Sequence, residues 1–205
     1  MLNKANIAVF VSGGGTNLQA LIDAQQSGFI KSGEIKVVIA SKEGVYAMER
    51  AANANIPAVA IQRKDYESQE AYEDALVEVL KQYDIDLIIL AGFLSILSEH
   101  FTEQYQNRII NVHPALIPSF CGKGFYGLKV HEAALDYGVK VTGATVHFVN
   151  EVPDGGRIIY QKAVEIEDGD TPEVLQKRVM EQAEWILLPK AAELVSSEIA
   201  KEKSV

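Results

Sequence analysis

Residues 108–118, RIINVHPALIP, hold the strongest chemical signal of the sequence. Asn111 and His113 lie two residues apart at the end of a predicted strand, so their side chains project from the same face of the sheet. An imidazole transfers protons near neutral pH, and a carboxamide donates hydrogen bonds to a developing oxyanion. An isolated N-x-H pair can also be a capped strand end, but ligands bind at the carboxyl ends of strands in α/β sheets. We therefore predict a catalytic pair.

A third group is needed to set the charge of this imidazole. The loop EVPDGG at residues 151–156 offers Asp154, which lies between Pro153 and Gly155. Pro-Asp-Gly is also good turn chemistry. From the residues alone, a plain turn and a catalytic carboxylate are both open interpretations of this loop.

The remaining histidines are predicted to be structural. His147 lies in the middle of a strand pattern, which is typical of a hydrogen-bonded core histidine, and His100 and His131 fall on predicted helix surfaces. No cluster of His, Cys or acidic residues has metal-ligand spacing. No metal is therefore expected.

Three consecutive glycines, Gly13 to Gly15, follow the apolar run ANIAVFV and precede the helical pattern TNLQALIDAQQ. Free amides and the positive end of a helix dipole meet at such a loop, which makes it an anion site. A tight turn without a ligand is the alternative, although one glycine would suffice for a turn. Leu18 stands where a dinucleotide fingerprint needs a small residue, and no Gly-Lys-Ser/Thr follows. The loop therefore predicts a simple phosphate cradle.

These groups need a scaffold of alternating strands and helices. Apolar runs predict strands at residues 5–11, 34–40, 57–61, 85–91 and 108–112, with two more at 141–150 and 157–166. Amphipathic patterns predict helices at residues 16–26, 45–54, 68–82, 126–137 and 171–198. The last helix opens with Thr171 as N-cap and Pro172 at its first position. The expected fold is α/β: a single domain with a mostly parallel twisted sheet, helices on both faces and an added C-terminal strand pair.

The composition is that of an ordinary globular protein, with 205 residues, of which 48% are hydrophobic and 23% charged. A formal net charge of −9 argues against nucleic acid as a partner, because phosphate backbones recruit basic surfaces. No signal peptide or membrane-spanning run is visible, and the single cysteine, Cys121, fits a reducing compartment. We expect a cytoplasmic protein without a membrane or nucleic-acid partner. The sequence leaves open whether it is a monomer or a homodimer.

Several motifs together resemble the phosphoribosylglycinamide formyltransferase family of purine biosynthesis. They are SGGGTNLQALIDA, LIILAGFLSILS, RIINVHPALIPSF and TGATVHFVNEVPDGG, followed by the closing helix, and they run in family order from about residue 5 to 190. The resemblance implies a formyltransferase-like fold with one catalytic domain over residues 1–205. Its phosphate-binding half would cover about residues 1–105, and its folate and catalytic half about residues 106–200.

The resemblance also implies a reaction between two small molecules. A formyl group would pass from the co-substrate 10-formyltetrahydrofolate to the amine of 5-phosphoribosylglycinamide. The products would be N-formylglycinamide ribonucleotide and tetrahydrofolate, and no metal would be needed.

Individual residues receive roles from the same resemblance. His113 would donate a proton, Asn111 would face the formyl group, and Asp154 would raise the pKa of His113. The residues that would bind the ribonucleotide are Gly15, Thr16, Asn17 and Glu184, the last of which, taken alone, is predicted to be solvated surface. The residues that would bind the folate are Asn111, Asp154, Gln69, Leu94, Ser95, Ile96, Leu97 and Ile109.

The sequence departs from the family pattern at three places. Gln69 and Ser95 replace common arginines, which changes the expected folate contacts, and residues 119–129 differ from a shorter proline-glycine segment. None of these departures touches the three predicted catalytic groups. By analogy with the family, the Ile117–Pro118 peptide bond is expected to be cis.

Three other functions fit parts of the pattern. A formyltetrahydrofolate hydrolase would use a similar Asn, His and Asp set with water in place of the amine, but would carry an extra N-terminal domain. A methionyl-tRNA formyltransferase would need a C-terminal RNA-binding domain and a less acidic surface. A non-catalytic phosphate-ligand-binding protein would keep the glycine loop but has no need of the three polar groups together.

Overall fold

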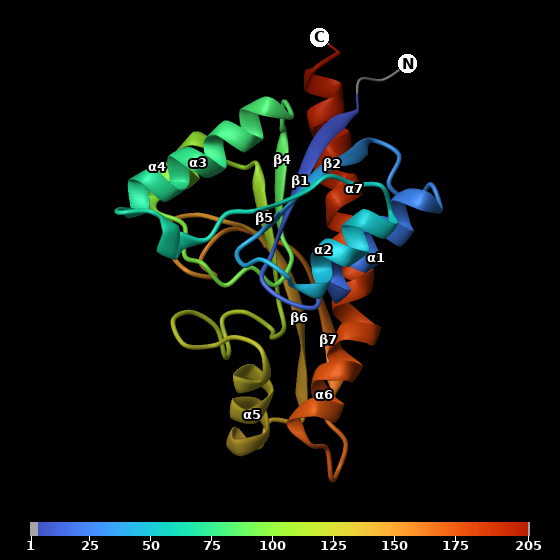
Figure 1. Ribbon diagram of the computed structural model, residues 1–205. Coiled ribbons are helices and arrows are strands. Elements are labelled where there is room, and N and C mark those ends of the chain that lie inside the picture. The colour runs from blue at the N-terminus through green and yellow to red at the C-terminus, as the bar shows by residue number, and fades with distance from the viewer. Residues whose placement is uncertain (1–3, 205) are drawn as a thin grey trace.

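A computed structural model describes residues 4–204, and a seven-stranded sheet runs through its centre (Figure 1). The strand order is β3-β2-β1-β4-β5-β6-β7. Strands β1 to β5 pair in parallel, and β6 and β7 continue the sheet in antiparallel orientation. The strands are β1 (Ala5–Val11), β2 (Gly33–Ala40), β3 (Ala58–Ala60), β4 (Leu87–Leu90), β5 (Ile109–His113), β6 (Val141–Phe148) and β7 (Ile158–Glu165).

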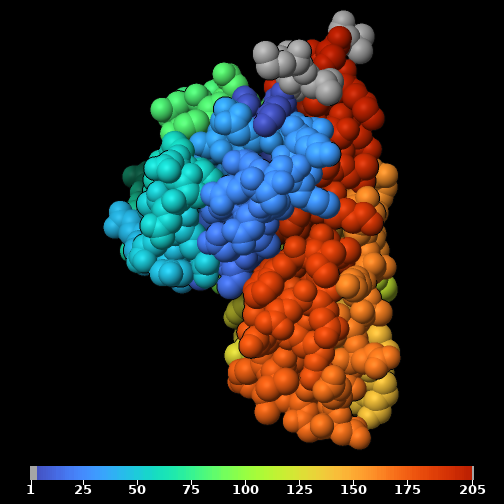
Figure 2. Space-filling model, turned by 90° about the vertical axis from the view of Figure 1, so that its right-hand side faces the viewer, coloured from blue at the N-terminus to red at the C-terminus, as the bar shows by residue number. Residues whose placement is uncertain are grey.

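Helices cover both faces of this sheet, as its apolar parallel strands require (Figure 1). One face carries α1 (Thr16–Gln26), α2 (Tyr46–Asn53), α6 (Pro172–Val179) and α7 (Trp185–Glu202). The other face carries α3 (Gln69–Gln82) and α4 (Glu99–Gln104), and α5 (Leu128–Tyr137) packs against α6. Figure 2 shows the blue N-terminal segment in contact with the red C-terminal helix, where α1 meets α7.

The central strand β1 is covered on both faces of the sheet, which explains its apolar sequence. Ile7 and Val9 point into the core beneath α1 and α7, whereas Ala8 and Phe10 point into the core beneath α3. All four side chains are fully buried. A strand covered on both faces has no position for an exposed polar side chain, so its residues cannot alternate between apolar and polar.

The predicted fold class is confirmed: the chain forms a single α/β domain with a mostly parallel sheet and an added antiparallel strand pair. Every predicted strand and the first four predicted helices occur, with bounds shifted by a few residues. The helix α4 was not predicted, because it is only six residues long. It begins after Ser98, whose side chain accepts a hydrogen bond from the amide of Phe101.

The predicted final helix is not continuous. The π-helical turn Met180–Glu184 separates α6 from α7, and the amide of Trp185 donates to the carbonyl of Met180, five residues earlier. The start of α6 is as predicted, since the Thr171 side chain accepts from the amide of Val174. Such π-turns insert one residue into a helix and occur frequently at functional sites.

Two further predictions concern single positions. The Ile117–Pro118 peptide bond is cis, as predicted. His131 was expected on a helix surface, which is wrong: α5 turns the face with Val130, His131 and Ala134 inward. His131 is fully buried, and neither of its ring nitrogens has a hydrogen-bond partner among the described residues.

Candidate active site

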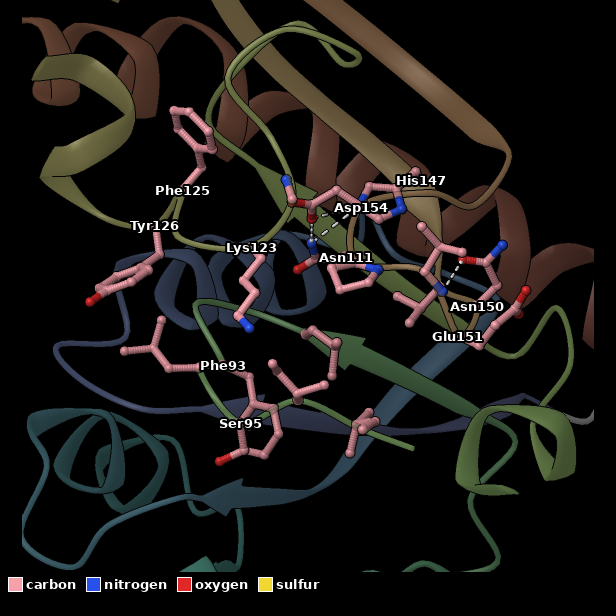
Figure 3. A pocket seen from close by; sticks show the side chains of 18 of the residues that line it. Phe93, Ser95, Asn111, Lys123, Phe125, Tyr126, His147, Asn150, Glu151 and Asp154 are labelled. Atoms are coloured by element: carbon pink, nitrogen blue, oxygen red, sulfur yellow. Dashed lines mark hydrogen bonds and ion pairs between the residues drawn. The ribbon is translucent and has the colours of Figure 1, made fainter. Parts of the chain in front are cut away.

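Asn111 and His113 lie at the carboxyl end of β5. Asp154 approaches Asn111 from the loop between β6 and β7 (Figure 3). The amide nitrogen Nδ2 of Asn111 lies 3.4 Å from Oδ1 of Asp154. Nδ1 of His113 lies 3.6 Å from the other carboxylate oxygen, Oδ2. The structure therefore brings together the three groups that the sequence predicts to be catalytic.

His113 is buried, and both of its ring nitrogens face acceptors. Its Nε2 lies 2.8 Å from the carbonyl oxygen of Phe120, and its Nδ1 faces Asp154. Burial lowers the pKa of His113 below its ordinary value, although the Asp154 carboxylate and the Phe120 carbonyl act to raise it. Asp154 therefore acts on the pKa of His113 in the predicted direction, but the net pKa is lowered because the desolvation of a buried cation is the larger effect.

Asp154 is held in a left-handed backbone conformation, with φ at 57°, which Asp tolerates better than most residues. The amide of Gly122 donates to its Oδ2 at 2.8 Å. Burial acts to raise the pKa of Asp154, but the interactions with His147, His113 and this amide outweigh burial and lower it. The carboxylate is therefore ionised at neutral pH.

A fourth polar group, His147, completes the cluster and was predicted only as a core residue. It is buried, and its Nδ1 lies 2.8 Å from the carbonyl oxygen of Phe148. In the neutral ring the other nitrogen, Nε2, then accepts from Nδ2 of Asn111 at 3.2 Å. The antiparallel register pairs Asn111 directly with His147, which the strand pattern alone does not reveal.

A cavity of about 470 Å³ opens in front of Asn111 and Asp154 (Figure 3). Its walls are mostly apolar, and Phe125 and Tyr126 close one side. The predicted folate residues that line it are Leu94, Ser95, Ile96, Leu97, Asn111 and Asp154. An apolar cavity of this size with a few polar groups at one end suits a flat ring system with a reactive substituent.

Two predicted folate residues, Ile109 and Gln69, lie outside this lining. The side chain of Ile109 is fully buried in the core beneath α3. Gln69 lies behind the cavity wall, where its Nε2 donates to the carbonyl of Ile96 at 3.1 Å and to Oε1 of Glu73 at 2.7 Å. Gln69 therefore holds the wall of the cavity in place.

The glycine loop lies between β1 and α1, as predicted. Gly15 has a φ of 71°, and a Cβ atom there would lie 2.7 Å from the Cβ of Ala47 on α2. Gly15 therefore needs both the left-handed conformation and the missing side chain. Its place at the start of α1 leaves the first amides of the helix free for an anion.

Glu184 and Asn17 meet beside this loop. Nδ2 of Asn17 donates to Oε2 of Glu184 at 2.6 Å, and Thr16 points its hydroxyl at the sulfur of Met180. Glu184 is buried, so the prediction of solvated surface is wrong; the π-turn directs its side chain inward. Burial raises the pKa of Glu184 to about 7, and only the bond from Asn17 lowers it.

Ser12 joins the glycine loop to the wall of the cavity. Its hydroxyl oxygen accepts from the amide of Leu94 at 2.9 Å and from the hydroxyl of Ser41 at 2.7 Å. Ser12 directly precedes the three glycines. The loop that would bind the phosphate and the loop that lines the apolar cavity are therefore fixed relative to each other through one buried hydroxyl.

The comparison with protein families decides the assignment. Residues 5–191 match the model described as formyl transferase. The chain belongs to the formyl transferase family. In this formyl transferase, the match covers both the glycine loop and the cluster around His113.

Solved structures and curated sequences extend this result. Glycinamide ribonucleotide transformylase 1 from Symbiobacterium toebii is 39% identical, with a TM-score of 0.89 over 95% of this chain and 89% of that chain. Phosphoribosylglycinamide formyltransferase from Brucella melitensis is 40% identical, with a TM-score of 0.86 over 95% of this chain and 96% of that chain. The trifunctional purine biosynthetic protein adenosine-3 of Gallus gallus is 43% identical over 95% of this chain, which spans only 19% of that protein's length.

These similarities confirm the predicted family and fold, and they agree with the predicted type of enzyme. Within residues 4–204, no helix is long and apolar enough to cross a membrane. The same residues contain no group of three His, Cys, Asp or Glu side chains placed to hold a metal ion.

Proposed function

We propose that this formyl transferase passes a formyl group from 10-formyltetrahydrofolate to the amine of 5-phosphoribosylglycinamide. The products are N-formylglycinamide ribonucleotide and tetrahydrofolate, in purine biosynthesis. The observation that carries the proposal is that Asn111 and Asp154 line the polar end of an apolar cavity and that buried His113 lies against Asp154. The names of the similar solved structures support the same reaction.

The bound folate supplies the formyl group. Amine attack places negative charge on the formyl oxygen, and a carboxamide and an imidazole are suited to stabilise that charge. At 3.4 Å, the contact from Asn111 to Asp154 is long for a hydrogen bond, so this N–H is the one that Asn111 would redirect to the formyl oxygen. His147 keeps the carboxamide in orientation through the shorter 3.2 Å contact.

His113 is the proposed proton donor to the departing nitrogen. In the protonated ring Nδ1 also carries a proton, and the 3.6 Å separation from Asp154 leaves that proton without a full hydrogen bond and available for transfer. The carboxylate of Asp154 stabilises the protonated imidazole against the effect of burial. Asp154 is therefore proposed to charge His113, and the Phe120 carbonyl to orient it.

The ribonucleotide would occupy the glycine-loop side of the site. The amides of Gly15, Thr16 and Asn17 would hold the phosphate at the start of α1. Within residues 4–204, the Glu184 side chain has one hydrogen-bond partner, so its carboxyl group keeps acceptor capacity for the ribose hydroxyls. The proposed phosphate-binding half at about residues 1–105 and the folate and catalytic half at about residues 106–200 exchange some residues, because Glu184 would bind the ribonucleotide and residues 94–97 line the folate cavity.

The proposal includes the setting in which the enzyme works. Both substrates are small molecules, and the net charge of −9 disfavours nucleic acid. A cytoplasmic location fits the single cysteine. A monomer or a homodimer is compatible with a site built from residues of one chain.

One assay tests the function. The purified chain is incubated with 10-formyltetrahydrofolate, with and without the ribonucleotide, and the release of tetrahydrofolate is followed. We expect release only when the ribonucleotide is present. Release without it would indicate a hydrolase, and binding of both ligands without any release would indicate a non-catalytic binding protein. In the same assay His113→Ala should lower kcat by about 10²-fold or more with little change in either KM, because the contact matters in the transition state.

A further inference from the structure

Helix α2 contacts the glycine loop from the side opposite to the proposed phosphate position. The guanidinium of Arg50 donates from Nε to the carbonyl of Gly14 at 2.8 Å. One turn earlier, the amide of Ala47 donates to the carbonyl of Gly13 at 3.2 Å. Two successive loop carbonyls are therefore bound to the same helix.

This arrangement fixes the direction of the loop amides. In a planar trans peptide, the carbonyl of one residue and the amide of the next point in opposite directions. The carbonyls of Gly13 and Gly14 point at α2, so the amides of Gly14 and Gly15 point away from it. Among the described residues, neither amide donates a hydrogen bond to another protein group. They remain free for an anion on the other side of the loop.

Arg50 is itself held in place from two further directions. Its NH1 donates to Oε1 of Gln19 on α1 at 3.0 Å, and its guanidinium lies over the ring of Tyr46 at 4.8 Å. The planar guanidinium of Arg50 thus contacts α1, α2 and the glycine loop at the same time. A lysine, with a single ammonium group, or a neutral side chain cannot make these contacts together. Arg50 also places a positive charge next to the loop, in a chain whose net charge of −9 repels anions.

We infer that Arg50 is a positioning residue for the phosphate of the ribonucleotide, an inference that rests on the proposed function. Through the Gly14 carbonyl it keeps the loop amides directed at the phosphate, and its charge lowers the cost of bringing an anion to an acidic protein. Of its five N–H donors, the one on Nε is bound to the loop carbonyl and one on NH1 to Gln19, so the contact that the structure shows acts through the loop.

The test compares Arg50→Leu and Arg50→Gln with a matched control, Lys81→Leu, which removes the same charge from an exposed position on α3. The probe is inorganic phosphate, whose binding to each full-length protein is followed by ³¹P NMR. The single tryptophan, Trp185, gives a second signal, because it lines the same 620 Å³ cavity as Arg50 and Thr16. Melting temperatures establish that each variant is folded.

We expect both Arg50 variants to weaken phosphate binding by about tenfold, which corresponds to about 1.4 kcal/mol, and Lys81→Leu to bind like the wild type. In the formyl-transfer assay, the KM for the ribonucleotide should rise by a similar factor while the KM for the folate stays within twofold. The Gln variant keeps the test valid if the Leu variant does not fold.

Three results would overturn the inference: wild-type protein that does not bind phosphate, folded Arg50 variants that bind it like the wild type, or a Lys81→Leu variant that is equally weakened. Failure of the proposed function gives a different pattern. In that case phosphate binding would still depend on Arg50, but no formyl transfer to the ribonucleotide would be seen.

Discussion

Asp154 lies 3.6 Å from each of two imidazoles, those of His113 and His147, so one carboxylate contacts both rings. Burial places the pKa of His113 below its ordinary value, and Asp154 acts in the opposite direction. Removing the carboxylate by Asp154→Asn should therefore lower the pKa of His113 further. An NMR titration of the His113 ring in both proteins measures this change. A pKa that stays constant or rises in the variant would contradict the proposed role of Asp154.

His131 links burial to stability. Burial lowers the pKa of this imidazole to about 4, and both nitrogens lack partners among the described residues. The unfolded chain binds a proton at this residue near pH 6.5 and the native chain near pH 4, so stability is lost as the pH falls through this window. At pH 5 the loss is up to about 2 kcal/mol relative to neutral pH.

His131→Leu should remove this dependence while filling the same apolar site. We expect the difference in unfolding free energy between pH 7.5 and pH 5, measured by urea denaturation, to shrink by up to about 2 kcal/mol. His100→Gln, at an exposed position on α4, serves as control and should leave the difference unchanged. If the unfolding free energy of His131→Leu fell between pH 7.5 and pH 5 by as much as that of the wild type, other groups would cause the acid sensitivity.

Among the individual site residues, those marked by a local sequence pattern could be predicted, and those placed by contacts between distant segments could not. Asn111, His113 and Asp154 were predictable, because a strand end and a Pro-Asp-Gly loop are visible in the chain. The place of His147 depends on the antiparallel register of β5 and β6, and the burial of Glu184 on a π-turn. Arg50 carries no local signal at all, since its role arises from α2 lying against the glycine loop.

Among the structural elements, the segment between β4 and α4 lines the cavity and is held from behind by α3. Gln69 donates to the carbonyl of Ile96, and Glu73 accepts from the amide of Ser98 at 2.6 Å. Arg63 extends this series of hydrogen bonds, because its Nε donates to Oε1 of Gln69 at 3.0 Å. The wall of the cavity therefore depends on a row of hydrogen bonds that begins outside it.

Gln69→Arg would break this row, since an arginine cannot accept from Arg63 and places two cations side by side. Each lost hydrogen bond costs about 0.5–1.5 kcal/mol, so the KM for the folate should rise about three- to tenfold while kcat changes little. Steady-state kinetics with varied folate measure this effect. Gln82→Arg, the same substitution at the exposed end of α3, is the control. A lower KM in Gln69→Arg would mean that a cation near the cavity outweighs the loss of the wall contacts.

The elements themselves were largely predictable, because near-continuous apolar runs separated by amphipathic stretches specify a parallel sheet with covered faces. The six residues of α4 are too few for a periodic pattern. The turn at Met180–Glu184 was missed because every residue in it is compatible with an ordinary helix. It forms through tertiary contacts such as the bond from Asn17 to Glu184.

On the scale of the whole molecule, the last helix covers the first strands. The buried residues of α7 include Leu187, Leu188, Val195 and Ile199, which pack in the same core as Ile7 and Val9. At about 1.5–3 kcal/mol each, these four side chains contribute about 6–12 kcal/mol, which is comparable to the entire stability of a typical domain.

A chain that ends at Glu184 should therefore fail to fold, although it keeps every strand of the sheet. Circular dichroism and thermal denaturation of the truncated chain measure this outcome. A chain that lacks only residues 203–205 should fold like the full chain, because α7 ends at Glu202. Cooperative unfolding of the shorter chain would show that the strands and the other helices are sufficient without α7.

Asp86 ties the two ends of the described chain to one place. Its Oδ2 accepts from the amide of Asn6 at 2.8 Å and from Nζ of Lys203 at 2.5 Å. The start of β1 and the end of α7 lie together at the top of Figure 1, away from the α5 end of the molecule. A linker of a few residues could therefore join them, and new ends could be opened in the exposed turn between β7 and α6. Such a circular permutant would keep all the contacts of the site while its elements followed one another in a different order along the chain.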